Sequence, residues 1–441
     1  MLPLLITYMQ ECEPSPFPRT LYPEDSAQSI FFTQKGIEKW FNTLLNDGTL
    51  NISGQQFPDM KQTLDLGVTK IEMILTDIVV SEFSVGHVDV MLKDNNVVPM
   101  VLAGVRFVLR FNWKIQQTSY PYVSDQGTGK VIVSDTDFST LCAVDCDYDL
   151  CPNHLLARIL HAELRIGVLK VVLDGGSSWM FQSMINVIMG VLQDYLQKFL
   201  TYFLSNDVVD ILNDMFYKYK SYDNYKQSVS IVKDERFVSP WTIKDGYFYL
   251  LFSGYIYHDS NKSDEFITAD MLEPVTQNRF NIDSEIILAD AGFNNLYYIF
   301  HKYENAFSKP GEFEVLEAPT VEFLNSAALF TLKLSLNGST VNVQLQGTPV
   351  YHRLERERHR CVFYFSFQKY QIESEASLDL EQLETSVVDW TNQVMNQKTF
   401  LSMINSEMFE IEKYKYILDP EEQVIRFLLV LSDSEQNVNM I

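Results

Sequence analysis

The hydrophobic pattern divides the first half of the chain into a short helix and a long sheet. In residues 33–48 apolar side chains recur at helical spacing, and Asp47-Gly48 ends the repeat. From 49 to 174 the apolar period falls to two, which is typical of strands. The run at 101–111 exceeds the five or six residues of an ordinary strand. Long alternating segments with tight turns predict a highly twisted antiparallel sheet.

A long amphipathic helix is expected after this sheet, over residues 179–205. Ser177 or Ser178 is a good N-cap for it. Its apolar positions form one continuous stripe about 30–40 Å long at ~1.5 Å per residue. Packing in a core is the plain explanation of most of this stripe. A polar, tyrosine-rich stretch at 217–226 then breaks the pattern and indicates a linker.

The second half repeats this organisation with different residues. Strands are expected over 246–257, and a strand at 284–290 leads into an apolar helical stretch that ends near 307. The remaining expected elements are strands at 328–336, 341–346 and 361–370, a helix at 379–397, and a closing hairpin of 414–418 with 424–431. The fold class is therefore α+β, with two highly twisted antiparallel sheets, each wrapped on a long helix. A curved sheet around a helix can leave an elongated apolar space that suits an acyl chain.

Composition favours a well-packed, acidic protein. The chain has 441 residues, of which 46% are hydrophobic, and its formal net charge is −24. A field of that sign repels nucleic acid and anionic membranes, although a local basic patch can still act because salt screens the long range. The most basic run, at 352–360, contains two glutamates. It is explained either as a solvated strand edge or as an anion site.

The sequence carries weak signs of secretion. No apolar run is long enough to span a membrane, and the apolar start at Met1–Tyr8 lacks the basic residues of a signal peptide, although it could be the remnant of a truncated one. Three N-x-S/T sequons place glycosylation candidates at Asn51, Asn261 and Asn337. We expect an extracellular protein or one in the secretory lumen.

Three of the five cysteines cluster at Cys142, Cys146 and Cys151, followed by His154. This spacing matches no common zinc site. A local disulfide, free buried thiols and, less readily, a metal site all remain open for the cluster. We expect no metal and no cofactor.

No catalytic motif is present. The chain contains no H-E-x-x-H, no G-x-S-x-G and no dinucleotide fingerprint. Gly127-Thr128-Gly129-Lys130 imitates part of a phosphate-binding loop, but Ser124 replaces its first glycine and Val131 its Ser/Thr. We do not expect an enzyme.

Several segments, in order, resemble one family. They are 29–37 (SIFFTQKGI), 52–59, 88–90, 111–114, 178–179, 286–295, 417–420 and 427–429. The chain resembles the family of bactericidal/permeability-increasing protein (BPI), lipopolysaccharide-binding protein (LBP), cholesteryl ester transfer protein and phospholipid transfer protein. The resemblance runs over roughly 27–435 and rests on the order of the segments.

The resemblance implies the tubular lipid-binding fold, a boomerang of two barrels joined by a central sheet. It implies an N-terminal arm at 1–26, a first lipid-binding barrel at 27–215, a linker with central-sheet strands at 216–245, and a second barrel at 246–441. It also implies lipid binding or transfer outside the cell, with phospholipid or another acyl lipid as ligand. A membrane or lipoprotein surface is the expected transient partner, and no nucleic acid is expected.

Two departures from the family change the expectation. Residues 175–220 contain no cysteine, so the family's disulfide to the long helix cannot form. The lysine-rich tip of the lipopolysaccharide-binding members is also missing, because 113–122 holds one lysine. Aromatic rings stand there instead, at Trp113, Tyr120 and Tyr122, and either contact a membrane interface or simply pack.

The helical stripes supply the candidate lipid contacts. They are Ile37, Phe41, Ile185, Ile188, Leu192 and Leu196 in the first half, and Leu383, Val387 and Trp390 in the second. An alternative is that the fold serves as a protein-interaction module without bound lipid.

Overall fold

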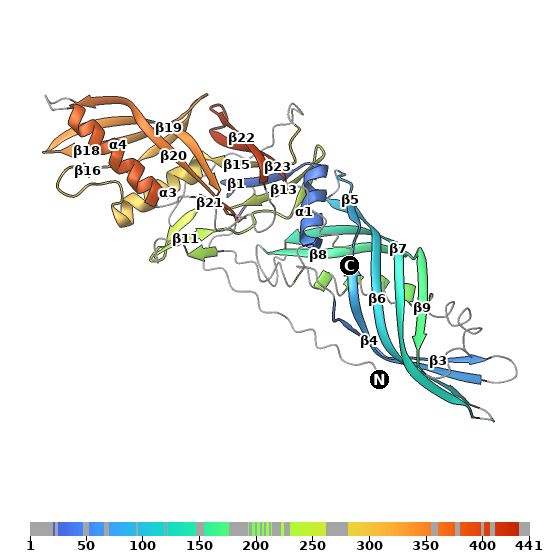
Figure 1. The fold of residues 1–441 in the computed structure, drawn as a ribbon. Helices are drawn as coiled ribbons and strands as arrows, with labels where there is room; N and C mark the ends of the chain where they lie inside the picture. The colour runs from blue at the N-terminus through green and yellow to red at the C-terminus, as the bar shows by residue number, and fades with distance from the viewer. Residues whose placement is uncertain are drawn as a thin grey trace.

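The computed structural model describes most of the chain and shows an elongated molecule (Figure 1). The described residues are 21–22, 25–46, 53–65, 70–93, 96–118, 120, 122–146, 154–175, parts of 193–213, 222–224, 230–261, 281–353, 360–374, 380–397, 401–405 and 411–431. One sheet forms each end, and a third sheet lies between them. The pairings between the named strands are all antiparallel, as expected from the turns and alternation.

The first sheet contains the longest strands. Its order is β2-β4-β6-β7-β8, with β3 also on β4, β5 on β6 and β9 on β7. Its strands are β2 (Gln56–Phe57), β3 (Met60–Asp65), β4 (Lys70–Ser84), β5 (His87–Val90), β6 (Val97–Gln117), β7 (Ser124–Cys146), β8 (Leu155–Arg165) and β9 (Val168–Asp174). The alternating run therefore extends beyond 101–111 in both directions. Described residues between 193 and 213 are helical, and Leu196 packs in the core of this sheet.

The central sheet joins segments from both ends of the chain. Its order is β12-β13-β1-β15-β23-β22. Its strands are β12 (Thr242–Lys244), β13 (Tyr247–Phe252), β1 (Gln28–Phe32), β15 (Ser284–Ala289), β23 (Val424–Leu431) and β22 (Ile411–Asp419). The strand before the QKG segment thus belongs to the central sheet, and it pairs there with β13 and β15.

The strands expected over 246–257 form two separate elements. Gly254 takes a positive φ of 70° and ends the first of them after Phe252. The second piece, β14 (Ile256–His258), joins a separate sheet with β11 (Ile231–Asp234) and β10 (Tyr222–Asn224). Part of the tyrosine-rich segment expected to be a linker is therefore the strand β10.

The second end repeats a sheet with helices. Its strands are β16 (Glu314–Val315), β17 (Thr320–Phe323), β18 (Ala328–Leu336), β19 (Ser339–Arg353), β20 (Arg360–Ser374) and β21 (Leu401–Asn405). Two helices accompany it, α3 (Asp290–Glu304) and α4 (Leu380–Gln397). Both lie close to the positions that periodicity predicts, because each buries one apolar stripe.

Helix α1 (Gln34–Asn46) connects the central sheet to the first sheet. On one side Lys39 Nζ donates to Asp283 Oδ2 at 3.0 Å and to the Leu431 carbonyl at 2.6 Å. On the other side the backbone N–H groups of Val88 and Val90 in β5 donate to Asn42 and Glu38. The helix therefore satisfies backbone groups of an edge strand that would otherwise lack partners.

Candidate functional site

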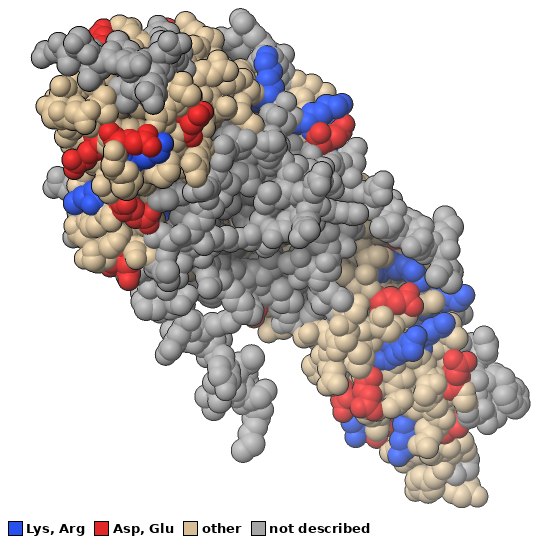
Figure 2. Space-filling model, turned by 60° about the vertical axis from the view of Figure 1, so that its left-hand side comes forward, with Lys and Arg blue, Asp and Glu red and all other residues tan. Residues whose placement is uncertain are grey.

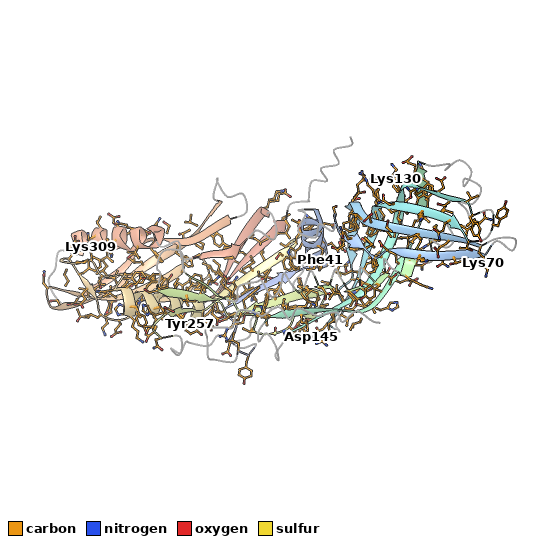
Figure 3. The ribbon with its side chains drawn as sticks, turned by 90° about the horizontal axis from the view of Figure 1, so that it is seen from below. Phe41, Lys70, Lys130, Asp145, Tyr257 and Lys309 are labelled. Carbon is orange, nitrogen blue, oxygen red and sulfur yellow. The ribbon has the colours of Figure 1, made fainter. Side chains whose placement is uncertain are left out.

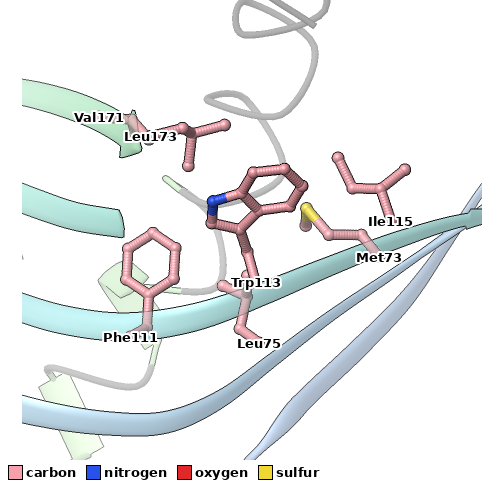
Figure 4. A pocket seen from close by; sticks show the side chains of 7 residues that line it. All are labelled: Met73, Leu75, Phe111, Trp113, Ile115, Val171 and Leu173. Carbon is pink, nitrogen blue, oxygen red and sulfur yellow. The ribbon is translucent and has the colours of Figure 1, made fainter. Parts of the chain in front are cut away.

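The inner face of the first sheet holds an open apolar recess (Figure 4). Its lining side chains come from three strands: Met73 and Leu75 from β4, Phe111, Trp113 and Ile115 from β6, and Val171 and Leu173 from β9. Its cavity volume is about 10 Å³, about the space of one water molecule, and it opens to solvent. Every lining side chain is apolar, so the recess fits hydrocarbon.

Strand alternation brings these residues to one side. Successive side chains of a strand point to opposite faces, so residues 111, 113 and 115 share the inner face. In β4 and β6 the register places Leu75 opposite Trp113 and Met73 opposite Ile115. The sequence signal was present as period-two alternation, but periodicity alone does not say which face of a long strand is covered and which stays open.

Two glycines make room for the aromatic floor of the recess. Gly127 lies opposite Trp113 and Gly129 opposite Phe111 in the β6–β7 pairing. A Cβ at Gly127 would lie 2.9 Å from the Trp113 ring, and one at Gly129 would lie 2.6 Å from the Phe111 ring. The segment that imitates a phosphate-binding loop is therefore strand β7. Its glycines leave space in which the two rings lie across the neighbouring strand.

Trp113 is buried, so of its two expected roles it packs in the core and does not contact a membrane. Its side chain is 2% exposed, and its indole N–H donates to the Thr128 carbonyl at 2.9 Å. Side chains of β6 alternate between the two faces of the sheet. Residues 112 and 114 are exposed on the outer face, so the ring of residue 113 lies on the inner face. The other two aromatics do reach solvent: Tyr120 is 85% and Tyr122 68% exposed, at the connection between β6 and β7.

The helical residues predicted to contact lipid lie in different surroundings. Ile37 is buried where α1 packs on the central sheet, and Phe41 is half-buried beside Trp40, with ring centroids 5.3 Å apart. Leu196 packs in the same core as the recess residues. Ile185, Ile188 and Leu192 lie outside the described residues. None of the three described residues lines the recess.

In the second half the described core is filled by aromatic rings. Phe293, Tyr297 and Phe330 pack with their neighbours at ring-centroid distances of 4.8–5.8 Å. Val387 is fully buried at α4, and Trp390 is half-buried against the same core. Leu383 lies in α4, but its side chain is outside the described set. These rings fill the described core between α3 and the sheet. The residues expected to contact lipid in this half lie on α4 instead.

Cys142 is a free, buried thiol, so of the alternatives left open for the cluster the free thiol holds at this residue and the disulfide does not. Its side chain packs in the core between the first and central sheets, because it lies on the inward-facing positions of β7. Burial raises the pKa of this thiol to about 12. The side chain of Cys146 and the whole of Cys151 are outside the described residues.

The sequons differ in exposure. Asn337 is exposed at the tip of the β18–β19 hairpin, with a positive φ of 50°. Asn261 is half-buried and its backbone N–H donates to the His258 carbonyl. Asn51 lies outside the described residues.

Two other features are absent from the described residues. No group of three or more His, Cys, Asp or Glu side chains is placed to hold a metal ion there. None of the helices in that part of the chain has the length and hydropathy needed to cross a bilayer.

Comparisons with known proteins agree with the expected resemblance. No family model matches the chain. A protein of Arabidopsis thaliana named as a BPI/LBP family protein is 24% identical over 166 residues, which is 37% of this chain and 33% of that protein's length. The chain therefore matches about a third of that relative.

Among solved structures, lipopolysaccharide-binding protein superposes with a TM-score of 0.57 and 11% identity, covering 92% of this chain and 99% of the other. This shows that the two proteins share a fold. Takeout 1 of Epiphyas postvittana covers 45% of this chain and 95% of its own length at 10% identity, but its TM-score of 0.25 is too low to support an argument.

Proposed function

Since the chain resembles the BPI/LBP family in sequence and has the fold of lipopolysaccharide-binding protein, we propose that it binds the acyl chain of a lipid in the recess of the first sheet. The observation that carries the proposal is the recess itself, whose lining side chains are all apolar. Each buried CH₂ group contributes about 0.8 kcal/mol, so affinity requires no special polar residue. This accounts for the lack of a sharp sequence motif.

The proposal assigns the lipid to the first half. There the aromatic floor is held by Trp113 and Phe111, and Leu173 on β9 forms part of the opposite wall. The described core of the second half is already filled by its own rings. Phospholipid is the proposed ligand class, in a transfer or carrier role outside the cell. The tip residues Tyr120 and Tyr122 are proposed contacts with a lipid interface, where tyrosine rings are favoured.

Native mass spectrometry of the purified chain, followed by solvent extraction, tests the proposal. We expect one phospholipid or related lipid for each chain. A chain that carries no lipid and does not take up a fluorescent phosphatidylcholine would contradict lipid binding, and would favour a protein-interaction module.

Two substitutions on β9 test whether the lipid binds in the recess. Leu173→Phe adds bulk to the recess, whereas Val172→Phe adds it to the opposite face of the same strand, because successive side chains alternate. Only Leu173→Phe is expected to reduce uptake of the fluorescent lipid. Equal effects of both substitutions would place the lipid elsewhere.

A further inference from the structure

Helical residues of the first half lie along the outer edge of β8, the last strand in the described order of the first sheet. Every described residue between 193 and 213 is helical, and we call this segment the edge helix. Asn213 Oδ1 accepts the Ala157 N–H at 2.7 Å, and Asn213 Nδ2 donates to the Ala157 carbonyl at 3.1 Å. Asp145, opposite the residue before Ala157, is labelled in Figure 3. The carboxamide therefore takes the place of a next strand at this edge, and we call this contact the latch.

A second contact joins the edge helix to the same strand. Gln197 Nε2 donates to the Leu164 carbonyl at 3.3 Å. Between the two contacts the helix spans about 24 Å at ~1.5 Å per residue. The strand spans about 23 Å between them at ~3.3 Å per residue. Because the two lengths match, the helix runs antiparallel along the strand edge.

The second half contains the same arrangement over a filled core. Asn392 of α4 accepts the Phe367 N–H and donates to the Phe367 carbonyl, both at 2.8 Å. The Phe367 ring packs on Phe330 with centroids 4.8 Å apart. In the first half, by contrast, the helix packs through Leu196 on the core that contains the recess.

The recess must widen to admit an acyl chain, because its cavity volume of about 10 Å³ is about the space of one water molecule. The strands around it are joined by long backbone ladders between β4 and β6, β6 and β7, and β7 and β9. Among the described residues, side chains alone hold the edge helix to the sheet. Moving the helix therefore breaks far fewer hydrogen bonds than separating two strands.

The seam between helix and strand offers an apolar path. Leu160 on β8 is 58% exposed and Tyr202 on the edge helix is 56% exposed, and both lie between the two contacts in sequence. Charge does not single out another entry side on the face that Figure 2 shows, since basic and acidic side chains are interspersed over the end formed by the first sheet. An acyl chain that passes between helix and strand meets apolar side chains on both.

We propose that the edge helix is a lid on the recess, and that the latch between Asn213 and Ala157 sets the rate at which lipid enters. The inference rests on the proposed binding of an acyl chain in the recess. Asn213 acts as a positioning residue, because it holds the helix and not the lipid. The latch forms in the empty and in the loaded protein, so its loss accelerates entry and exit alike and leaves the affinity unchanged.

Uptake of a short-chain fluorescent phosphatidylcholine, presented to the full chain as monomers, tests the lid. Asn213→Leu removes both hydrogen bonds with little change in side-chain volume. This variant is expected to take up the lipid about tenfold faster than the wild-type chain, with the same amount bound at equilibrium. Hydrogen exchange followed by mass spectrometry should also show faster exchange in β8, since the Ala157 N–H loses its acceptor.

Two control substitutions separate the lid from general destabilisation. Asn206→Leu changes an exposed carboxamide of the same helix, whose Nδ2 donates to the Tyr202 carbonyl within that helix. Asn392→Leu breaks the equivalent contact of the second half. Neither is expected to accelerate uptake. Acceleration by either control, or an unchanged rate in Asn213→Leu, would overturn the lid and leave lipid binding in place, whereas a wild-type chain that takes up no lipid would contradict the proposed function itself.

Hydrogen exchange in the wild-type chain decides the question if Asn213→Leu does not fold. A lid opens while the sheet stays intact, so the edge helix is expected to exchange faster than β6 and β7. Exchange of the helix at the same rate as β6 and β7 would overturn the lid.

Discussion

Gly36 lies against the backbone of Asp283, so close that a Cβ at position 36 would be 1.7 Å from the Asp283 carbonyl oxygen. The same carbonyl accepts the backbone N–H of Thr33 at 3.0 Å. The first turn of α1 is therefore packed directly on the segment that enters β15. The glycine of the QKG segment has a physical role: it lets helix and central sheet approach without a side chain between them.

Gly36→Ala is expected to destabilise the protein by about 3 kcal/mol, because backbone must move to admit the methyl group. The matched control is Gly292→Ala, at the third residue of α3, where the Cβ would be 3.2 Å from that of Ala27. The control should cost less, since the helix propensity of alanine offsets the tight contact. Urea unfolding measures both. Equal losses would contradict the close approach at Gly36.

Lys39→Met is expected to cost about 2 kcal/mol. Lys39 Nζ donates to the Leu431 carbonyl and to Asp283, whose buried carboxylate also accepts the Leu431 N–H. Without the Lys39 ammonium group, the buried Asp283 carboxylate loses part of the positive charge that stabilises its ionised form. In a double-mutant cycle, the further loss caused by Asp283→Asn should be smaller in the Lys39→Met background. Additive losses would show that the two side chains act independently.

Cys142 should resist alkylation in the folded protein. Burial raises the pKa of this thiol from 9.0 to about 12, so at pH 8 its thiolate fraction is on the order of a thousandfold smaller than that of an ordinary cysteine. Iodoacetamide treatment followed by peptide mass mapping is expected to find residue 142 unmodified in buffer and modified in urea. Rapid modification in buffer would show that the strand opens locally.

Asp290 should make stability depend on pH. Burial, together with the nearby charge of Glu322, raises the pKa of this carboxyl against the opposing hydrogen bond of Ala291. The native state therefore binds the proton more tightly than the unfolded state, and this group's contribution to stability declines as pH rises through its folded pKa. Asp290→Asn is expected to raise the melting temperature at pH 7. The gain should disappear below about pH 4, where the aspartate is protonated in both states.

Asn337 is expected to carry an N-linked glycan when the chain is secreted from eukaryotic cells. It is exposed at a hairpin tip and followed by Gly338-Ser339. Digestion with a glycosidase, with Asn337→Gln as control, should show the same mass shift that the substitution produces. Secreted protein without a glycan at this position would contradict the predicted modification.

Local rules determined much of the element list from the sequence. Periodicity placed α1, α4, β18 and the closing hairpin within a few residues of their bounds, because each of them buries one side and leaves the other in water. The same rule missed the break at Gly254. There the backbone turns between two sheets, and the apolar run continues across the turn.

The tertiary structure alone decided which apolar residues are covered and which form a site. Ile37 and Phe111 are both apolar positions of amphipathic elements, yet Ile37 is enclosed between α1 and the central sheet while Phe111 lines the recess. The difference arises from contacts between strands far apart in the chain, such as β4 with β6 and β7 with β9. Which neighbour covers a side chain depends on sheet register and curvature, and a single strand's alternation carries no information on either.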